Sequence, residues 1–132
     1  MDEKSIHDND VVSYSVLCRE RKLVIQTEII IGAVLERTDV VFRGLEAYAL
    51  DGDNLDTVLF SIDRVEVDRL VDEEQQRFSD GVNYGWPGSW NTSIEDSKEC
   101  LKNRNCVAWR IQSSIGMEGF VVAQSMEFKA HS

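Results

Sequence analysis

The sequence contains little proline, cysteine or histidine, and it has no long apolar run. Its 132 residues include one proline, three cysteines and two histidines. The uninterrupted apolar runs are only a few residues long, which is too short for a helix that crosses a bilayer. Three cysteines cannot pair completely within one chain, and residues 1–6 lack the apolar core of a signal peptide. We therefore expect reduced thiols in a cytoplasmic protein.

Positive charge is also scarce. Fourteen Lys and Arg stand against 24 Asp and Glu, which gives a formal net charge of −10. Nonspecific nucleic-acid binding and attraction to anionic membranes both need a basic surface, so we expect neither kind of partner. The 42% hydrophobic content is that of an ordinary globular chain. The length suits one domain with a real core, and we interpret residues 1–132 as a single domain.

The negative charge is concentrated in one part of the chain. Residues 1–50 carry nine acids and six bases, residues 51–80 carry ten acids and three bases, and residues 81–132 carry five of each. Seven of the ten excess charges therefore lie within thirty residues. This distribution indicates an acidic face, which would attract a basic protein partner. The alternative is a solvated surface whose charge serves solubility alone.

Alternating apolar and polar residues predict strands, and a change of period predicts helices. The expected strands cover residues 12–18, 23–31, 38–50, 57–65, 107–113 and 120–128. Residues 68–81 form a first helix, with Asp68 as its N-cap and Gly81 as its end. A second helix covers residues 92–103, and Thr92 and Glu95 have the spacing of a capping box.

Short turns between neighbouring strands favour antiparallel pairing. The predicted fold class is therefore α+β, with a mainly antiparallel curved sheet or partial barrel of about six strands. The two short helices are expected between the fourth and fifth strands.

The sequence offers one candidate metal or acid–base cluster, formed by His7, Asp8 and Asp10 and joined by Glu46 of the third expected strand. It supports an alternative function as a metal-dependent enzyme or metal-binding protein. The simpler interpretation is a strand entry, in which the carboxylates cap exposed backbone groups.

The chain has no His-x-x-His, Cys-x-x-Cys or Gly-x-Ser-x-Gly spacing and no phosphate-binding glycine motif, so we predict no catalytic residues and no cofactor.

Aromatic residues are concentrated in residues 82–91, a segment that includes Tyr84, Trp86 and Trp90. Such rings either fold back as a lid over the core or anchor a binding partner.

A further alternative is a small-ligand carrier, whose cavity would be lined by Tyr14, Phe42, Phe60 and Trp109; the simpler interpretation of these four rings is ordinary core. A homodimer is compatible with the sequence.

Several short segments resemble those of a group of small, uncharacterised bacterial proteins. They are His7-Asp8, Val-Phe-Arg-Gly at 41–44, Tyr-Gly-Trp-Pro at 84–87, and the glycine-containing hairpin at 113–120. In size, acidity and fold class the chain is also similar to immunity proteins, which neutralise toxins. Neither resemblance implies catalytic residues.

The leading hypothesis is a non-enzymatic, small acidic binding domain, and its most specific form is an immunity-type inhibitor of a basic protein. The predicted partner-binding residues are Asp68, Asp72, Glu73, Glu74, Tyr84, Trp86 and Trp90.

Overall fold

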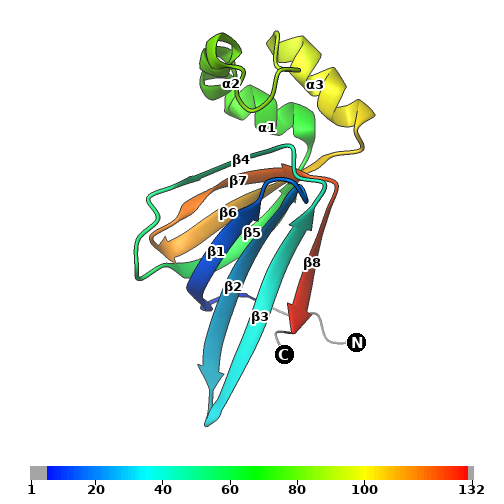
Figure 1. The fold of residues 1–132 in the computed structure, drawn as a ribbon. Helices are drawn as coiled ribbons and strands as arrows, with labels where there is room; N and C mark the ends of the chain where they lie inside the picture. The colour runs from blue at the N-terminus through cyan, green and yellow to red at the C-terminus, as the bar shows by residue number, and fades with distance from the viewer. Residues whose placement is uncertain (1–5, 131–132) are drawn as a thin grey trace.

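The computed structural model describes residues 6–130 as one antiparallel sheet with a group of helices at one end (Figure 1). The strands are β1 (Asp10–Leu17), β2 (Lys22–Ile31), β3 (Val34–Arg43), β4 (Ala47–Asp51), β5 (Val58–Val65), β6 (Val107–Ile115), β7 (Glu118–Ala123) and β8 (Ser125–Ala130). The helices are α1 (Val67–Glu73), α2 (Gln75–Gly81) and α3 (Ile94–Asn103), with a short 3-10 turn, η1 (Val82–Tyr84), after α2. The strand order is β4-β7-β6-β5-β1-β2-β3-β8, so the sheet is open, with β4 and β8 at its edges.

The prediction of about six strands with two short helices between the fourth and fifth is wrong. The sheet has eight strands, and three α-helices lie between β5 and β6. The expected strand 38–50 is divided into β3 and β4, and the expected strand 120–128 is divided into β7 and β8. The expected helix 68–81 is divided at Glu74 into α1 and α2.

Both strand divisions occur at one place in the fold. Gly44 has a φ of 69°, and a Cβ added there would lie 2.5 Å from the Gln124 side-chain oxygen. The Gln124 backbone N–H donates to the carbonyls of Arg43 and Gly44. The left-handed glycine and the interposed Gln124 therefore interrupt two paired strands together, and β3 pairs with β8 while β4 pairs with β7.

The helix starts also differ from the prediction. Glu66, not Asp68, is the N-cap of α1, and its side chain makes no capping hydrogen bond. At α3 the N-cap is Ser93, whose hydroxyl accepts from the Asp96 backbone N–H at 3.0 Å. Thr92 instead donates to the Asp96 carboxylate at 2.7 Å. The Ser93 cap satisfies one free N–H of the first turn of α3.

Two apolar clusters hold the fold together. One lies within the curved sheet and includes Leu23, Phe42 and Trp109. The other joins the helices to the sheet: Leu70 of α1 and Phe78 of α2 pack with Phe120 of β7. Burial of large apolar side chains is the main force that holds the helices on this end of the sheet. Among the described residues, no helix has the length and hydropathy needed to cross a membrane.

Candidate binding surfaces

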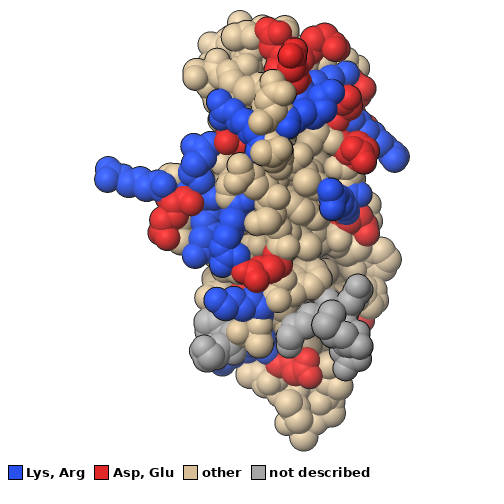
Figure 2. All heavy atoms as spheres, turned by 90° about the vertical axis from the view of Figure 1, so that its right-hand side faces the viewer, with Lys and Arg blue, Asp and Glu red and all other residues tan. Residues whose placement is uncertain are grey.

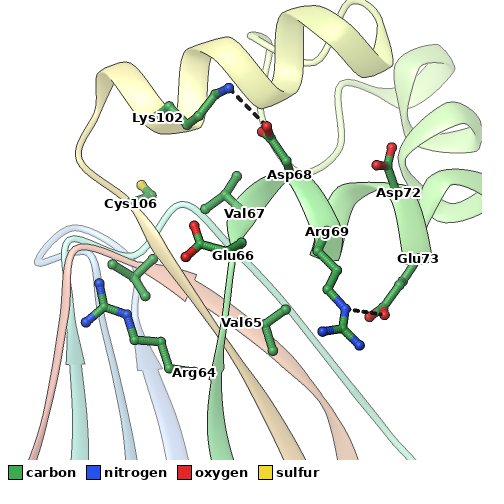
Figure 3. Close-up of a pocket in the computed structure, with 11 residues that line it drawn as sticks. Arg64, Val65, Glu66, Val67, Asp68, Arg69, Asp72, Glu73, Lys102 and Cys106 are labelled. Atoms are coloured by element: carbon green, nitrogen blue, oxygen red, sulfur yellow. Dashed lines mark hydrogen bonds and ion pairs between the residues drawn. The ribbon is translucent and has the colours of Figure 1, made fainter.

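A hollow of about 490 Å³ lies beside α1, where β5 ends and the helices begin (Figure 3). Strand β5 leads directly into α1, and Lys102 near the end of α3 faces them. The hollow is lined by Arg64, Val65, Glu66, Val67, Asp68, Arg69, Asp72, Glu73, Lys102, Cys106 and Val107. Four carboxylates and three basic side chains therefore surround it.

Most of these charges are already paired. The Oδ2 atom of Asp68 lies 3.1 Å from the Lys102 ammonium group, and Figure 3 shows the two side chains turned toward each other. Asp72 pairs with Lys98 at 2.7 Å, which raises the pKa of Lys98 through the hydrogen bond. Glu73 pairs with Arg69 at 3.0 Å. The paired side chains leave less free charge in the hollow than the sequence alone indicates.

Two of the carboxylates that line the hollow have an acceptor without a partner among the described residues. The Oδ1 atom of Asp68 is buried and has no hydrogen-bond partner among the described residues. The carboxylate of Glu66 likewise makes no hydrogen bond or ion pair within residues 6–130. The Asp68 oxygen is closed to solvent in this structure, so the exposed Glu66 carboxylate is the unused acceptor that a ligand in the hollow can reach directly.

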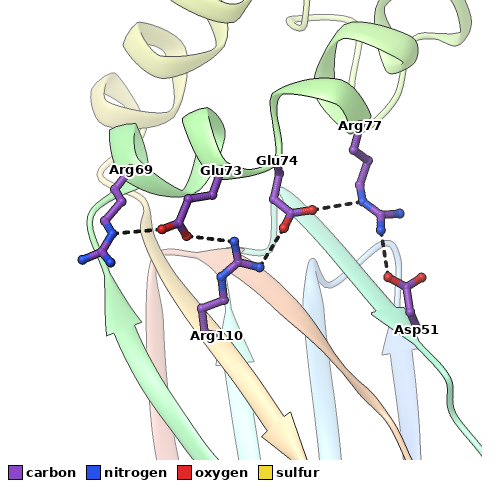
Figure 4. A network of polar contacts seen from close by, with 6 residues as sticks. All are labelled: Asp51, Arg69, Glu73, Glu74, Arg77 and Arg110. Carbon is purple, nitrogen blue, oxygen red and sulfur yellow. Dashed lines mark hydrogen bonds and ion pairs between the residues drawn. The ribbon is translucent and has the colours of Figure 1, made fainter.

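A chain of alternating charges fastens the helices to the sheet (Figure 4). Arg110 of β6 lies 2.9 Å from Glu73 and 2.8 Å from Glu74. Arg77 of α2 extends the chain from Glu74 to Asp51, the last residue of β4, at 2.8 Å. Hydrogen bonds from Arg110 and Arg69 lower the pKa of Glu73. Glu73 and Glu74 are thus occupied in an internal network.

The predicted partner-binding acids are divided between these two features. Asp68, Asp72 and Glu73 line the hollow, whereas Glu74 lies in the network and does not reach the hollow. Sequence reasoning missed Glu66 and Lys102. Glu66 had a usable signal, because it stands at the junction of the expected strand and helix, but no sequence pattern pointed to Lys102.

The aromatic segment packs mainly against the helices. Trp86 and Trp90 are half-buried beside the helical core, and the rings of Trp86 and Phe78 have centroids 5.4 Å apart. The Arg104 guanidinium lies 6.0 Å from the ring centroid of Trp90. Tyr84, by contrast, is 85% exposed. The two tryptophans therefore cover the helical core as a lid, whereas the Tyr84 side chain is exposed to solvent. None of these three residues lines the hollow beside α1.

The His7 cluster does not assemble into a larger group. His7 Nδ1 lies 3.1 Å from the Phe60 carbonyl, and its Nε2 lies 3.5 Å from Asp8. Asp10 begins β1, opposite Glu28 of β2. Within residues 6–130, no three His, Cys, Asp or Glu side chains come together as a set that could hold a metal ion.

The four rings of the carrier hypothesis do not line one cavity. Phe42 and Trp109 pack edge to face inside the sheet core, with ring centroids 5.5 Å apart. Phe60 is half-exposed and lies against His7. Tyr14 is partly exposed and donates a hydrogen bond to Asp53 at 2.6 Å.

A second surface, the β2–β3 tip, was missed by the sequence analysis. We define this tip as residues 29–35, in which Gly32 and Ala33 join the two strands. Its large exposed side chains are Ile30 (70%), Ile31 (56%), Val34 (61%) and Leu35 (46%). Figure 2 shows this end of the molecule without charged groups. The missed signal is Ile30, which breaks the alternation of the expected strand with an apolar residue on its polar side.

The hollow and the β2–β3 tip lie at opposite ends of the molecule (Figure 1). The hollow offers unused acceptors, and the tip offers apolar surface. Comparison of the chain with family models, curated proteins and solved structures finds no match, so the chemistry of these two surfaces is the basis for assigning a function.

Proposed function

We propose that the protein is a non-enzymatic binding domain for a basic protein, and that the hollow beside α1 receives a Lys or Arg side chain of that partner. The observation that carries this proposal is the exposed carboxylate of Glu66, which lines the hollow and makes no hydrogen bond or ion pair within residues 6–130. Asp68 lines the same hollow, but its Oδ1 atom is buried without a donor, so this side chain must rotate before that oxygen can bind a ligand.

A cationic side chain matches these acceptors chemically. An ammonium group has three donors and a guanidinium has five, so either can bond the Glu66 carboxylate and keep donors for a neighbouring acceptor. Hydrogen bonds between charged groups contribute about 1.5–3 kcal/mol each, more than bonds between neutral groups.

Arg64 opposes the same ligand. Its side chain lines the hollow and has no ion-pair partner among the described residues. The other two bases in the hollow, Arg69 and Lys102, are neutralised by Glu73 and Asp68. Arg64 is therefore the one uncompensated positive charge there, and its removal should strengthen the binding of a cation.

The charge of the whole chain supports the same class of partner. A net charge of −10 speeds the encounter with a basic protein and repels an acidic one. In the immunity-type form of the proposal, the basic partner is a toxin and the bound complex is inactive. Co-expression with a candidate toxin tests this form: protection of the host cell supports it, and unchanged killing contradicts it.

The hollow can be tested with short peptides of defined charge. We would titrate the ¹⁵N-labelled protein with acetyl-Gly-Arg-Gly-amide and with the matching norleucine peptide, and follow amide chemical shifts by NMR. We expect the arginine peptide to shift the amides around Glu66 and Asp68, because Glu66 carries the accessible free acceptor and Asp68 lines the same hollow. The norleucine peptide, which lacks the cation, should leave them unchanged.

Two variants in the hollow and one control outside it test which residues bind the peptide. Glu66→Gln should weaken binding of the arginine peptide several-fold, whereas Arg64→Gln should strengthen it. Asp56→Asn is the matched control, because it removes the same charge from an exposed loop residue outside the hollow. Equal weakening by Glu66→Gln and Asp56→Asn, or shifts scattered over all acidic residues, would contradict a site in the hollow.

A further inference from the structure

The β2–β3 tip extends beyond the strands on either side of it. The last pair between β1 and β2 is Asp10↔Glu28, so Ile29, Ile30 and Ile31 have no strand partner on the β1 side among the described residues. Among the described residues, the last pair between β3 and β8 is Thr38↔Ala130, which leaves Val34 to Arg37 outside that ladder. Because backbone groups alternate in direction along a strand, each of these two edges presents N–H and C=O groups that are unpaired within residues 6–130.

The two free edges differ in their protection. Natural proteins block strand edges with charged side chains. The β3 edge carries Glu36 and Arg37, whereas the β2 edge carries three consecutive isoleucines. Isoleucine is among the residues with the highest preference for strands. Within the part of the chain that the structure describes, the β2 edge is therefore the unprotected one, and another strand can pair there.

We propose that two copies of the protein associate tip to tip, by antiparallel pairing of their Ile29–Ile31 edges around a two-fold axis at Ile30. This arrangement places Ile29 of one copy opposite Ile31 of the other, so no charged side chain enters the contact. It joins the two hairpins into one four-stranded ribbon with aliphatic side chains on both faces. The proposal is independent of the function proposed for the hollow, which lies at the other end of the molecule.

Charge favours this end-to-end arrangement over other self-contacts. Residues 66–104, which include the three helices, contain nine acids and five bases. Two molecules with a net charge of −10 repel each other, and the repulsion falls with distance because salt screens it. Contact through the tips keeps the helices of the two copies as far apart as the shape allows (Figure 1).

The size of the tip limits the strength of the dimer. Its four large side chains expose roughly 400 Å² per copy, within the range of the largest apolar patch on a typical monomer. Two tips together bury far less than the ~1,600 Å² of a standard interface. We therefore expect a weak dimer that forms at high protein concentration.

The first test measures association directly. Sedimentation velocity of the wild-type protein, taken up to about 1 mM, should show an average mass that rises with concentration, since a weak contact is half-formed near its Kd. Ile30→Lys should abolish the rise by placing a charge on the edge. Leu55→Lys is the matched control: it makes the same change at a 98% exposed leucine in the β4–β5 loop and should leave association intact.

The second test determines the register in which the β2 strands of the two copies pair. In a Cys18→Ser background, Ile30→Cys should form an intermolecular disulfide, because opposed residues of antiparallel strands have Cα atoms about 5 Å apart. Leu35→Cys, on the outer strand of the same tip, would lie about 15 Å from its counterpart and should cross-link at least ten-fold less.

Three outcomes would overturn the proposal. They are a monomer at every concentration, equal cross-linking of the two cysteine variants, and binding of the tip to phosphatidylcholine vesicles that Ile30→Lys removes. The last would assign the tip to a lipid surface.

Discussion

At the scale of single residues, the carboxylates of Glu46 and Asp68 differ in whether their buried oxygens are paired. The Glu46 side chain is only 9% exposed, and its Oε1 atom lies 2.9 Å from Arg21 and 2.8 Å from Arg104. These two arginines compensate the negative charge of Glu46, which explains why this carboxylate can be buried. Asp68 has one oxygen satisfied by Lys102 and the other buried without a donor. Neither oxygen of Asp68 is open to a ligand in this structure, so the exposed Glu66 carboxylate is the acceptor that the hollow offers.

Cys106 gives a prediction about stability at alkaline pH. Burial raises the pKa of its thiol to about 11, and the negative charge of Glu46 adds to the effect. The unfolded chain ionises this thiol first, so the free energy of unfolding should fall as the pH rises from about 9 to about 11, by at most about 3 kcal/mol in all. Below that range the thiol is neutral in both states and its contribution is constant.

Urea unfolding as a function of pH measures this effect. Cys106→Ala should lower stability at neutral pH but flatten the alkaline decline. Cys18→Ala removes an exposed thiol and should leave the decline unchanged. An equal slope in the wild-type protein and Cys106→Ala would show that this thiol is not the cause.

At the scale of elements, Gly119 determines how closely β4 approaches β7. A Cβ at this position would lie 1.8 Å from the Ala49 carbonyl oxygen, which is backbone and cannot turn aside. We expect Gly119→Ala to reduce the free energy of unfolding by about 3 kcal/mol in urea denaturation, since it must displace an edge strand.

Gly32→Ala provides the comparison for this prediction. Gly32 has a φ of 64° but open space around its Cβ position, so substitution costs only the backbone strain of about 1 kcal/mol. Equal losses in the two variants would contradict the close-approach explanation for Gly119.

The element scale also shows what the sequence could predict. Period-two alternation located the strand segments, because side chains such as Leu23, Ile25 and Phe42 do point alternately into the core. It did not show that Gln124 meets Gly44, since that contact joins residues far apart in the chain. For the same reason, the sequence located Asp68 but not its partner Lys102 on α3. The sequence therefore predicted local elements, whereas the strand divisions and the hollow depend on long-range packing.

At the scale of the whole molecule, the two proposed contacts can coexist. The hollow lies in the helical end and the β2–β3 tip at the opposite end (Figure 1). A tip-to-tip dimer would leave both hollows open and could bind two basic partners. Ile30→Lys should therefore leave partner binding unchanged, and Glu66→Gln should leave dimerisation unchanged.

The most direct measurement of the central claim is calorimetric titration of the protein with a basic protein that it captures from cells of its source and that is then purified. We predict binding that weakens as salt is raised, a several-fold loss of affinity in Glu66→Gln, and full affinity in the control Asp56→Asn. Binding that is insensitive to salt and unchanged in Glu66→Gln would contradict the assignment of the hollow beside α1 as the site for a basic partner.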